Sequence, residues 1–201
     1  MSMSRTATWK TILPLTLVAV AAASRLVPHV WNVSPLGAIA LFAGWRYGQK
    51  GNWLAALAIP LAALFLSDLA LNNFVYHLGP SSGQAWVWFY PGAVWTYAAI
   101  ALITCWGWLA LRRLTSVRLA GTSLGASCLF FLLSNFGVWQ SAQQFTPPMY
   151  PHTLAGLGEC YVAGLPFFSH TMLGDLLFCG LLFGAYHLAA KTLEAPAIQS
   201  A

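Results

Sequence analysis

Long apolar runs separated by short polar stretches are the feature that most constrains this chain. Only 6% of its 201 residues are charged, whereas a soluble domain carries about 25% charged residues. So few charges cannot cover the surface of a water-soluble fold. The sequence therefore predicts an integral membrane protein, and no stretch is long and polar enough to form a second, soluble domain.

Six apolar segments are predicted as the helices of a single transmembrane domain covering residues 1–201. They span residues 9–26, 35–47, 53–71, 90–111, 119–139 and 167–190. Five of them approach or exceed the ~20 residues that cross ~30 Å of hydrocarbon. The second has only 13 residues, which gives a helix of about 20 Å. We expect that helix to begin below one membrane surface, with Ser34 as its N-cap and Pro35 at its first position.

A short second helix requires the stretch before it, residues 24–35, to dip into the membrane. Irregular backbone at that depth is tolerated only where protein or a water-filled cavity surrounds it. The stretch contains Arg25, His29, Trp31 and Asn32, so we predict that it forms a cavity wall. The expected fold class is an all-α integral membrane protein: a six-helix transmembrane bundle with one short second helix and a partly membrane-dipping outer loop.

The basic residues predict the orientation of this bundle. Eight of the nine Lys and Arg residues fall on one side of it, and Arg25 is the exception. Because cytoplasmic loops carry an excess of Lys and Arg, we place both termini in the cytoplasm and the protein in the cytoplasmic (inner) membrane of a bacterium, in contact with membrane lipid. This distribution also argues against nucleic acid as a partner, despite the net charge of +5.

The first segment has a second interpretation. Arg5 and Lys10, an apolar run and the alanines at 21–23 also match a cleavable secretory signal. We expect the segment to be retained, because it leads directly into the polar stretch at 24–35.

Polar side chains gather in the outer half of the predicted bundle, whereas the inner half of each helix is mostly apolar. Ionisable residues inside a membrane usually face a bundle interior or a cavity, so this one-sided cluster predicts a pocket that opens outward rather than a continuous pore. Arg25 is the only outer cation for three acidic residues, and we expect it to pair with Asp68 or Asp175. The candidate substrate-binding residues are Arg25, His29, Trp31, Asn32, Asp68, His77, Asn135, Trp139, Tyr161, His170 and Asp175.

Small residues recur at four-residue spacing in three of the segments. The pairs are Ala19/Ala23, Gly121/Gly125 and Gly180/Gly184. Small side chains let membrane helices approach closely, so we expect these pairs to pack inside the bundle. The alternative for Ala19 and Ala23 is an interface with a partner membrane protein.

An ordered series of motifs in this chain resembles a family of small bacterial multi-pass proteins of unassigned function. The series covers residues 12–188 and reads Arg25-x-x-Pro28-His29-x-x-Asn32-x-Ser34-Pro35, Ala40-Leu41-Phe42-x-Gly44, Ser67-Asp68, Ser134-Asn135-Phe136-Gly137-Val138-Trp139, Tyr150-Pro151, Gly156-Leu157-x-x-Cys160-Tyr161, Leu165-Pro166-Phe167-Phe168 and Gly174-Asp175.

That family is similar to the substrate-binding S components of energy-coupling factor (ECF) vitamin transporters. The resemblance implies about six helices, cytoplasmic termini and an outward vitamin pocket. It also implies that Ala19 and Ala23 contact an ECF-type coupling subunit, which works with ATPases. Some S-component relatives move cobalamin and ligate cobalt through a cysteine near the outer end of helix three. Residues 72–80 hold no cysteine here, and His77 is the alternative nitrogen ligand.

The function expected from these residues is membrane uptake, not catalysis. A small, vitamin- or cofactor-like nutrient, with cobalamin among the candidates, would bind in the outward pocket, and no intrinsic cofactor or metal site is expected. The chain has no Walker-type nucleotide motif, so any ATP-driven step must come from a partner. Two alternatives stay open. One is a membrane enzyme or maturation factor that uses Asp68, His170 and Asp175 as acid–base groups; the other is a structural membrane protein that transports nothing.

Overall fold

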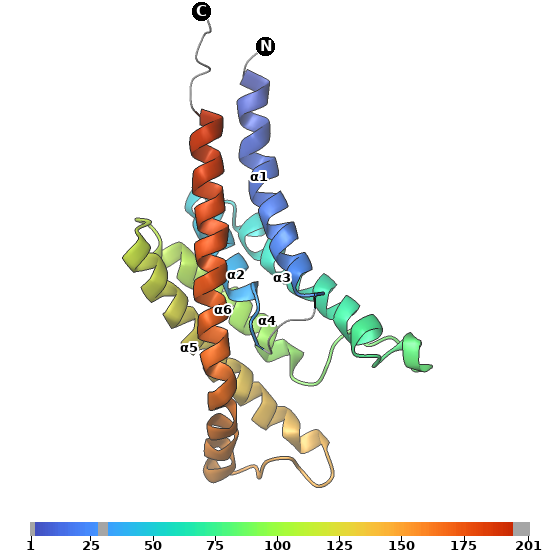
Figure 1. Ribbon diagram of the computed structural model, residues 1–201. Helices are drawn as coiled ribbons and strands as arrows, with labels where there is room; N and C mark the ends of the chain where they lie inside the picture. The colour runs from blue at the N-terminus through green and yellow to red at the C-terminus, as the bar shows by residue number, and fades with distance from the viewer. Residues whose placement is uncertain (1–2, 28–31, 195–201) are drawn as a thin grey trace, which may run out of the picture.

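The computed structural model of the protein describes residues 3–27 and 32–194, with side chains from residue 9 onward (Figure 1). Within these ranges the chain forms six α-helices, several short helical turns and no β-strand. The six helices are α1 (Met3–Ser24), α2 (Leu36–Arg46), α3 (Trp53–Ala70), α4 (Ala93–Ala110), α5 (Ser116–Ser141) and α6 (Leu154–Glu194). The predicted all-α architecture with a short second helix is therefore confirmed.

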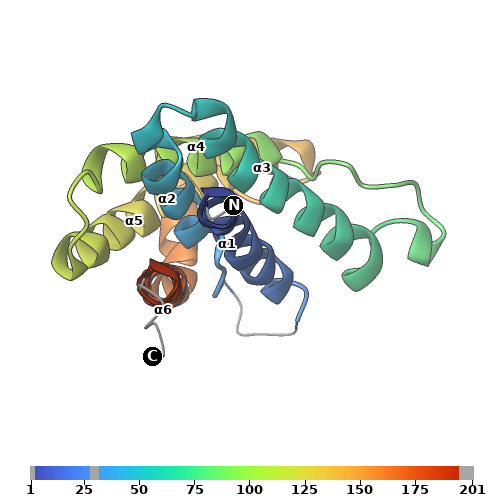
Figure 2. The ribbon, with the colours of Figure 1, turned by 90° about the horizontal axis from the view of Figure 1, so that it is seen from above.

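Five helices form a closed ring around the short α2. Contacts run from α1 to α3, α3 to α4, α4 to α5, α5 to α6 and α6 back to α1, and α2 contacts all five. Figure 2, which looks down on the molecule, shows α2 enclosed in this way. The N-terminal part of α1 and the C-terminal part of α6 lie at the same end of the molecule (Figure 1). We call this the terminal end, and the opposite one the loop end.

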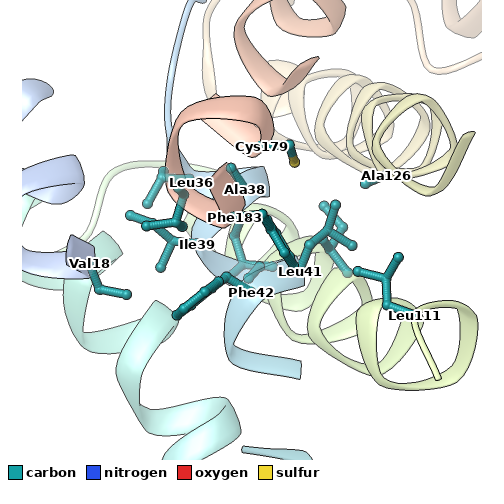
Figure 3. Packing of buried hydrophobic residues seen from close by; sticks show 14 of the residues in the cluster. Val18, Leu36, Ala38, Ile39, Leu41, Phe42, Leu111, Ala126, Cys179 and Phe183 are labelled. Atoms are coloured by element: carbon teal, nitrogen blue, oxygen red, sulfur yellow. The ribbon is translucent and has the colours of Figure 1, made fainter. Parts of the chain in front are cut away.

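The core of the protein is built on α2. Every residue from Leu36 to Gly44 is buried, and Figure 3 shows Ile39, Leu41 and Phe42 packed in the central cluster. Close approach of α4 is possible because two glycines lie in the interface. A Cβ on Gly44 would overlap the backbone carbonyl of Thr104, and a Cβ on Gly107 would meet the backbone of Leu41.

Side-chain caps fix the starts of three ring helices. Asn52 accepts a hydrogen bond from the Ala55 amide at the start of α3, at 3.1 Å. At the start of α5, Thr115 accepts an equivalent bond from the amide of Arg118. At the start of α6, Thr153 accepts one from the amide of Gly156. Such caps satisfy backbone donors that a helix leaves unpaired at its N-terminus.

The largest departure from the sequence prediction is α6, which is 41 residues long. The predicted segment 167–190 left Glu159 and Cys160 in the connection between the fifth and sixth helices. Instead both lie in α6, because Thr153 caps the helix start and the helix runs through Pro166. The start of α2 differs by one residue. Pro35 occupies the cap position, and the Ser34 hydroxyl lies 3.4 Å from the Leu36 amide.

The predicted packing of small-residue pairs is wrong for three of the glycines. A Cβ on Gly121, Gly180 or Gly184 would have nothing within 4 Å. Ala19 and Ala23 are likewise exposed on α1, so they remain available to lipid or to a partner protein.

In the part of the chain that the structure describes, four helical segments are long and apolar enough to cross a membrane. They are Trp53–Ser82, Ala93–Ala110, Ser116–Gln144 and Leu154–Glu194, and α1 adds a shorter apolar stretch, Trp9–Ser24. This composition is consistent with a membrane protein.

Candidate polar binding site at the loop end

A cavity of about 170 Å³, which we call the polar pocket, lies among helix ends on the loop-end side of the ring. The turn after α1, the start of α2 and the start of α4 contribute to it, together with α3, α5 and the middle of α6. Its lining residues are Arg25, Asn32, Ser34, Leu36, Gly37, Leu64, Tyr90, Thr96, Phe130, Thr171 and Asp175.

Arg25 forms one wall of the polar pocket and is held from behind by α3. One guanidinium nitrogen donates to Asp68 Oδ1 at 2.8 Å, and another donates to the Ser67 hydroxyl. The two charged side chains are largely buried, with 14% and 10% of their surface exposed. The predicted pairing of Arg25 with Asp68 or Asp175 is confirmed, and its partner is Asp68. This ion pair joins the end of α1 to α3.

Asp175 is the buried acid of the polar pocket. It is 3% exposed, and its Oδ2 accepts a 2.6 Å hydrogen bond from Ser127 of α5. Its carboxylate packs directly against the backbone of α2, because a Cβ on Gly37 would overlap it. The Asp175 carboxylate can occupy this position only because residue 37 has no side chain.

A second cavity of about 350 Å³, the hairpin pocket, lies between α5 and α6. Asn135 and Cys160 contribute to its polar lining, and Phe131, Phe167 and Phe168 to its apolar lining. The Asn135 side chain donates to the Phe131 carbonyl at 2.9 Å, and its Oδ1 faces Gly164 of α6, where a Cβ would overlap it. The Cys160 thiol donates to the Asn135 carbonyl at 3.3 Å.

The two pockets adjoin, since both are lined by Asn32, Phe130 and Thr171. Asn32 has a left-handed backbone conformation, with φ 63°, which asparagine adopts more readily than most residues. Ligand sites in proteins have volumes of about 300–1,000 Å³, with mostly apolar walls and a few polar groups. The polar pocket alone is below that range, but the two together fall within it.

Four of the predicted binding residues therefore line this pair of pockets, and a fifth supports them. Arg25, Asn32 and Asp175 face the polar pocket, Asn32 and Asn135 face the hairpin pocket, and Asp68 acts through Arg25.

Trp139 and Tyr161 lie beside the pockets and hold α5 to the start of α6. The indole of Trp139 donates to the Pro151 carbonyl at 3.0 Å and stacks on His152, with ring centroids 4.3 Å apart. The Tyr161 hydroxyl donates to the Leu132 carbonyl at 2.9 Å.

The predicted histidines do not line either pocket among the residues that the structure describes. His77 is exposed in the turn after α3, 3.1 Å from the Ser81 hydroxyl. His170 precedes the lining residue Thr171 on α6, and its buried Nδ1 has no hydrogen-bond partner within the described ranges. His29 and Trp31 lie outside the described residues. Within the described ranges, no three His, Cys, Asp or Glu side chains are grouped as a metal site requires.

The structure adds lining residues that the sequence prediction did not include. Ser127 holds Asp175, and Tyr90, Thr96, Phe130 and Thr171 complete the walls. The sequence does contain a pattern that could have indicated Ser127. Ser123 and Ser127 are four residues apart in α5 and therefore lie on one face of the helix. Tyr90 precedes α4. Burial raises the pKa of its phenol, whose hydrogen bond with Thr96 acts the other way.

Comparison with known proteins identifies a family for almost the whole chain. Neither the curated proteins nor the solved structures give a match. One family model matches residues 5–198 and is described as a family of unknown function, DUF6580. The chain that builds this bundle and its paired pockets therefore belongs to the DUF6580 family.

Proposed function

We propose that this chain is an integral membrane protein that takes up a small nutrient, vitamin- or cofactor-like, through the polar and hairpin pockets. The observation that carries the proposal is the convergence of Arg25, Asn32, Asn135 and Asp175 on two adjoining cavities at the loop end. Among these four residues Asp175 is buried, and a buried ionisable group is costly in a structure that has no use for it.

The outer surface of the ring supports the membrane location. Large apolar side chains are exposed on the helices, including Leu54 on α3, Val94 on α4, Leu132 on α5 and Leu173 on α6. A soluble monomer rarely exposes apolar patches of this extent, whereas hydrocarbon is a good solvent for them. We assign the loop end to the outer face, because the basic residues gather towards the terminal end.

The lining residues indicate the chemistry of the ligand. Arg25 and the two asparagines offer hydrogen-bond donors, Asp175 offers a carboxylate, and Leu36 and Phe130 supply apolar surface. A compact heterocycle with donors and acceptors on its rim fits this lining. The pocket volumes favour such a molecule over a corrin macrocycle, and His77 lies away from both pockets.

Delivery to the cytoplasm would follow the S-component pattern in this proposal. The exposed Ala19 and Ala23 on α1 offer a small-residue surface that a transmembrane coupling subunit could approach closely. Release of the nutrient requires rearrangement around α2, whose buried residues separate the polar pocket from the terminal end.

A ligand screen by thermal unfolding tests the proposal. The full chain in detergent would be heated with a panel of compact heterocyclic vitamins, with cobalamin included. A true ligand at one hundred times its Kd should stabilise the protein by about 2.7 kcal/mol. The variant Asp175→Asn should lose this response. Glu159→Gln, which removes an exposed acid from the same helix outside both pockets, should keep it.

Two outcomes would contradict the proposal: no compound stabilises the protein, or Asp175→Asn and Glu159→Gln respond alike. Reconstituted vesicles with a labelled ligand then separate uptake from the enzyme alternative. Accumulation of unchanged ligand supports uptake, whereas a product without accumulation supports catalysis by Asp68, His170 and Asp175. A purely structural protein would show neither.

A further inference from the structure

A further cavity, at the terminal end, has an excess of cationic side chains, whereas the polar pocket is lined by one cation and one acid. This basic pocket has a volume of about 480 Å³ and is lined by parts of α1, α2 and α6 and by the turns that follow α2 and α4. Four cations line it, namely Lys10, Arg46, Lys50 and Arg112, against one described carboxylate, Glu194. The cations come from four separate parts of the chain.

Arg46 is the buried centre of the basic pocket. It is 7% exposed, at the last residue of α2, and one Nη donates to the Lys10 backbone carbonyl at 2.7 Å. Its Nε is buried and has no hydrogen-bond partner among the described residues. A buried charged group is normally paired or fully hydrogen-bonded, so this guanidinium has unused capacity for an acceptor.

The surrounding charges do not supply that acceptor. Glu194 is bound to Lys10 at 3.3 Å, and both side chains are about half exposed. Burial lowers the pKa of Lys50, and the positive charges of Arg46 and Lys10 lower it further. The cations therefore repel one another, and a bound anion would relieve this repulsion.

Aromatic rings give the basic pocket an apolar wall. The Arg46 guanidinium lies 5.7 Å from the ring centroid of Tyr186, which lines the pocket. Arg112 lies 5.1 Å from the ring centroid of Trp108, a residue outside the lining. Trp9 and Trp45 also contribute to the lining, and the buried Nε1 of Trp9 has no partner within the described part of the chain. The wall thus offers a further donor next to an apolar surface.

From these contacts we infer that the basic pocket is a binding site for a phosphate-bearing anion, separate from the polar pocket. Arg46 would donate its free Nε–H to a phosphate oxygen, and Lys50 and Arg112 would neutralise the remaining charge. Guanidinium and ammonium groups are the usual partners of phosphate in proteins. The phosphate belongs either to the headgroup of an anionic lipid or to a soluble molecule.

Thermal unfolding of the full chain tests this site, with one arm for each source. In neutral detergent, inorganic phosphate and pyrophosphate are compared with chloride at equal ionic strength. In mixed micelles, phosphatidylglycerol and phosphatidic acid are compared with phosphatidylcholine. Stabilisation by at least one phosphate-bearing probe is expected, and the arm in which it occurs identifies the source.

Surface variants locate the effect without disturbing the buried Arg46. Lys50→Gln and Arg112→Gln are both exposed changes in the lining, and each should weaken the apparent affinity about tenfold, as expected for the loss of one charge-assisted hydrogen bond. Arg113→Gln and Arg118→Gln remove equal charges near the same end but outside the lining, and should leave the affinity unchanged. The inference is overturned if no phosphate-bearing probe stabilises the protein, or if all four variants weaken binding equally, which would indicate diffuse attraction.

Discussion

At the scale of single residues, charge scarcity made the Arg25 pairing predictable, but it could not select the partner. Asp68 and Asp175 both belong to the predicted outer cluster, so the sequence left the choice open. The structure resolves it through neighbours: Ser67 helps Asp68 to hold Arg25, whereas Ser127 holds Asp175. These contacts join residues that are 43 and 48 positions apart, and composition carries no information about such distances.

The Arg25–Asp68 pair yields a stability prediction. Asp68→Asn leaves Arg25 largely buried without its counter-charge, which should lower the free energy of unfolding by about 3–5 kcal/mol. The double variant Arg25→Met/Asp68→Leu removes both charges and should lose much less. Denaturation of the three proteins in the same detergent measures this. Equal stability of wild type and Asp68→Asn would show that the pair does not stabilise the fold.

The predicted inner half of the helices, which is mostly apolar in sequence, also contains buried polar residues. Arg46, Thr104, Thr122 and Ser123 are all buried there. Thr104 satisfies its hydroxyl within its own helix, by donating to the Ile100 carbonyl at 2.9 Å. A hydroxyl that is hydrogen-bonded within its own helix costs little free energy to bury. A threonine in an apolar run therefore does not by itself indicate a polar site. From the sequence, Arg46 counted only among the eight basic residues on the predicted cytoplasmic side.

At the scale of elements, helix existence was predictable and helix packing was not. The six segments follow from apolar runs. The start of the third at Trp53 was correct, and in the structure Asn52 caps it. The predicted start of the sixth at residue 167 was too late, since α6 begins at Leu154 and continues through Pro166. Glycine spacing did not predict which glycines lie at helix contacts. Whether a glycine allows a close contact depends on which element lies opposite it, and the spacing does not reveal that element.

The glycines provide a matched prediction about helix packing. Gly44→Ala places a methyl group on the Thr104 backbone carbonyl and should destabilise the protein by about 1–3 kcal/mol, because α2 and α4 must separate. Gly121→Ala, in open space on α5, should be neutral or stabilising by up to about 1 kcal/mol. Thermal unfolding compares them. Equal losses for the two variants would argue against the close α2–α4 contact.

At the scale of the whole molecule, one short buried helix separates the pockets at the two ends of the protein. The polar pocket contacts the first residues of α2 and the basic pocket contacts its last residues, while Ile39, Leu41 and Phe42 fill the space between (Figure 3). Passage from one end to the other therefore requires α2 to repack against its ring. The sequence predicted an outward pocket and a mostly apolar inner half. It did not predict that α2 forms the apolar layer beneath the pocket.

We propose that the polar pocket is a water-accessible cavity open to the outside of the cell, and cysteine labelling tests this directly. Thr171, which lines both loop-end pockets, would be replaced by cysteine in a chain whose four native cysteines are removed. His187→Cys, in the basic pocket, is the matched control. Intact cells would then be treated with a membrane-impermeant maleimide.

The account predicts that the cysteine at 171 is labelled in intact cells, whereas the one at 187 is labelled only after permeabilisation. An unreactive cysteine at 171 under both conditions, or labelling there only from the cytoplasmic side, would contradict it.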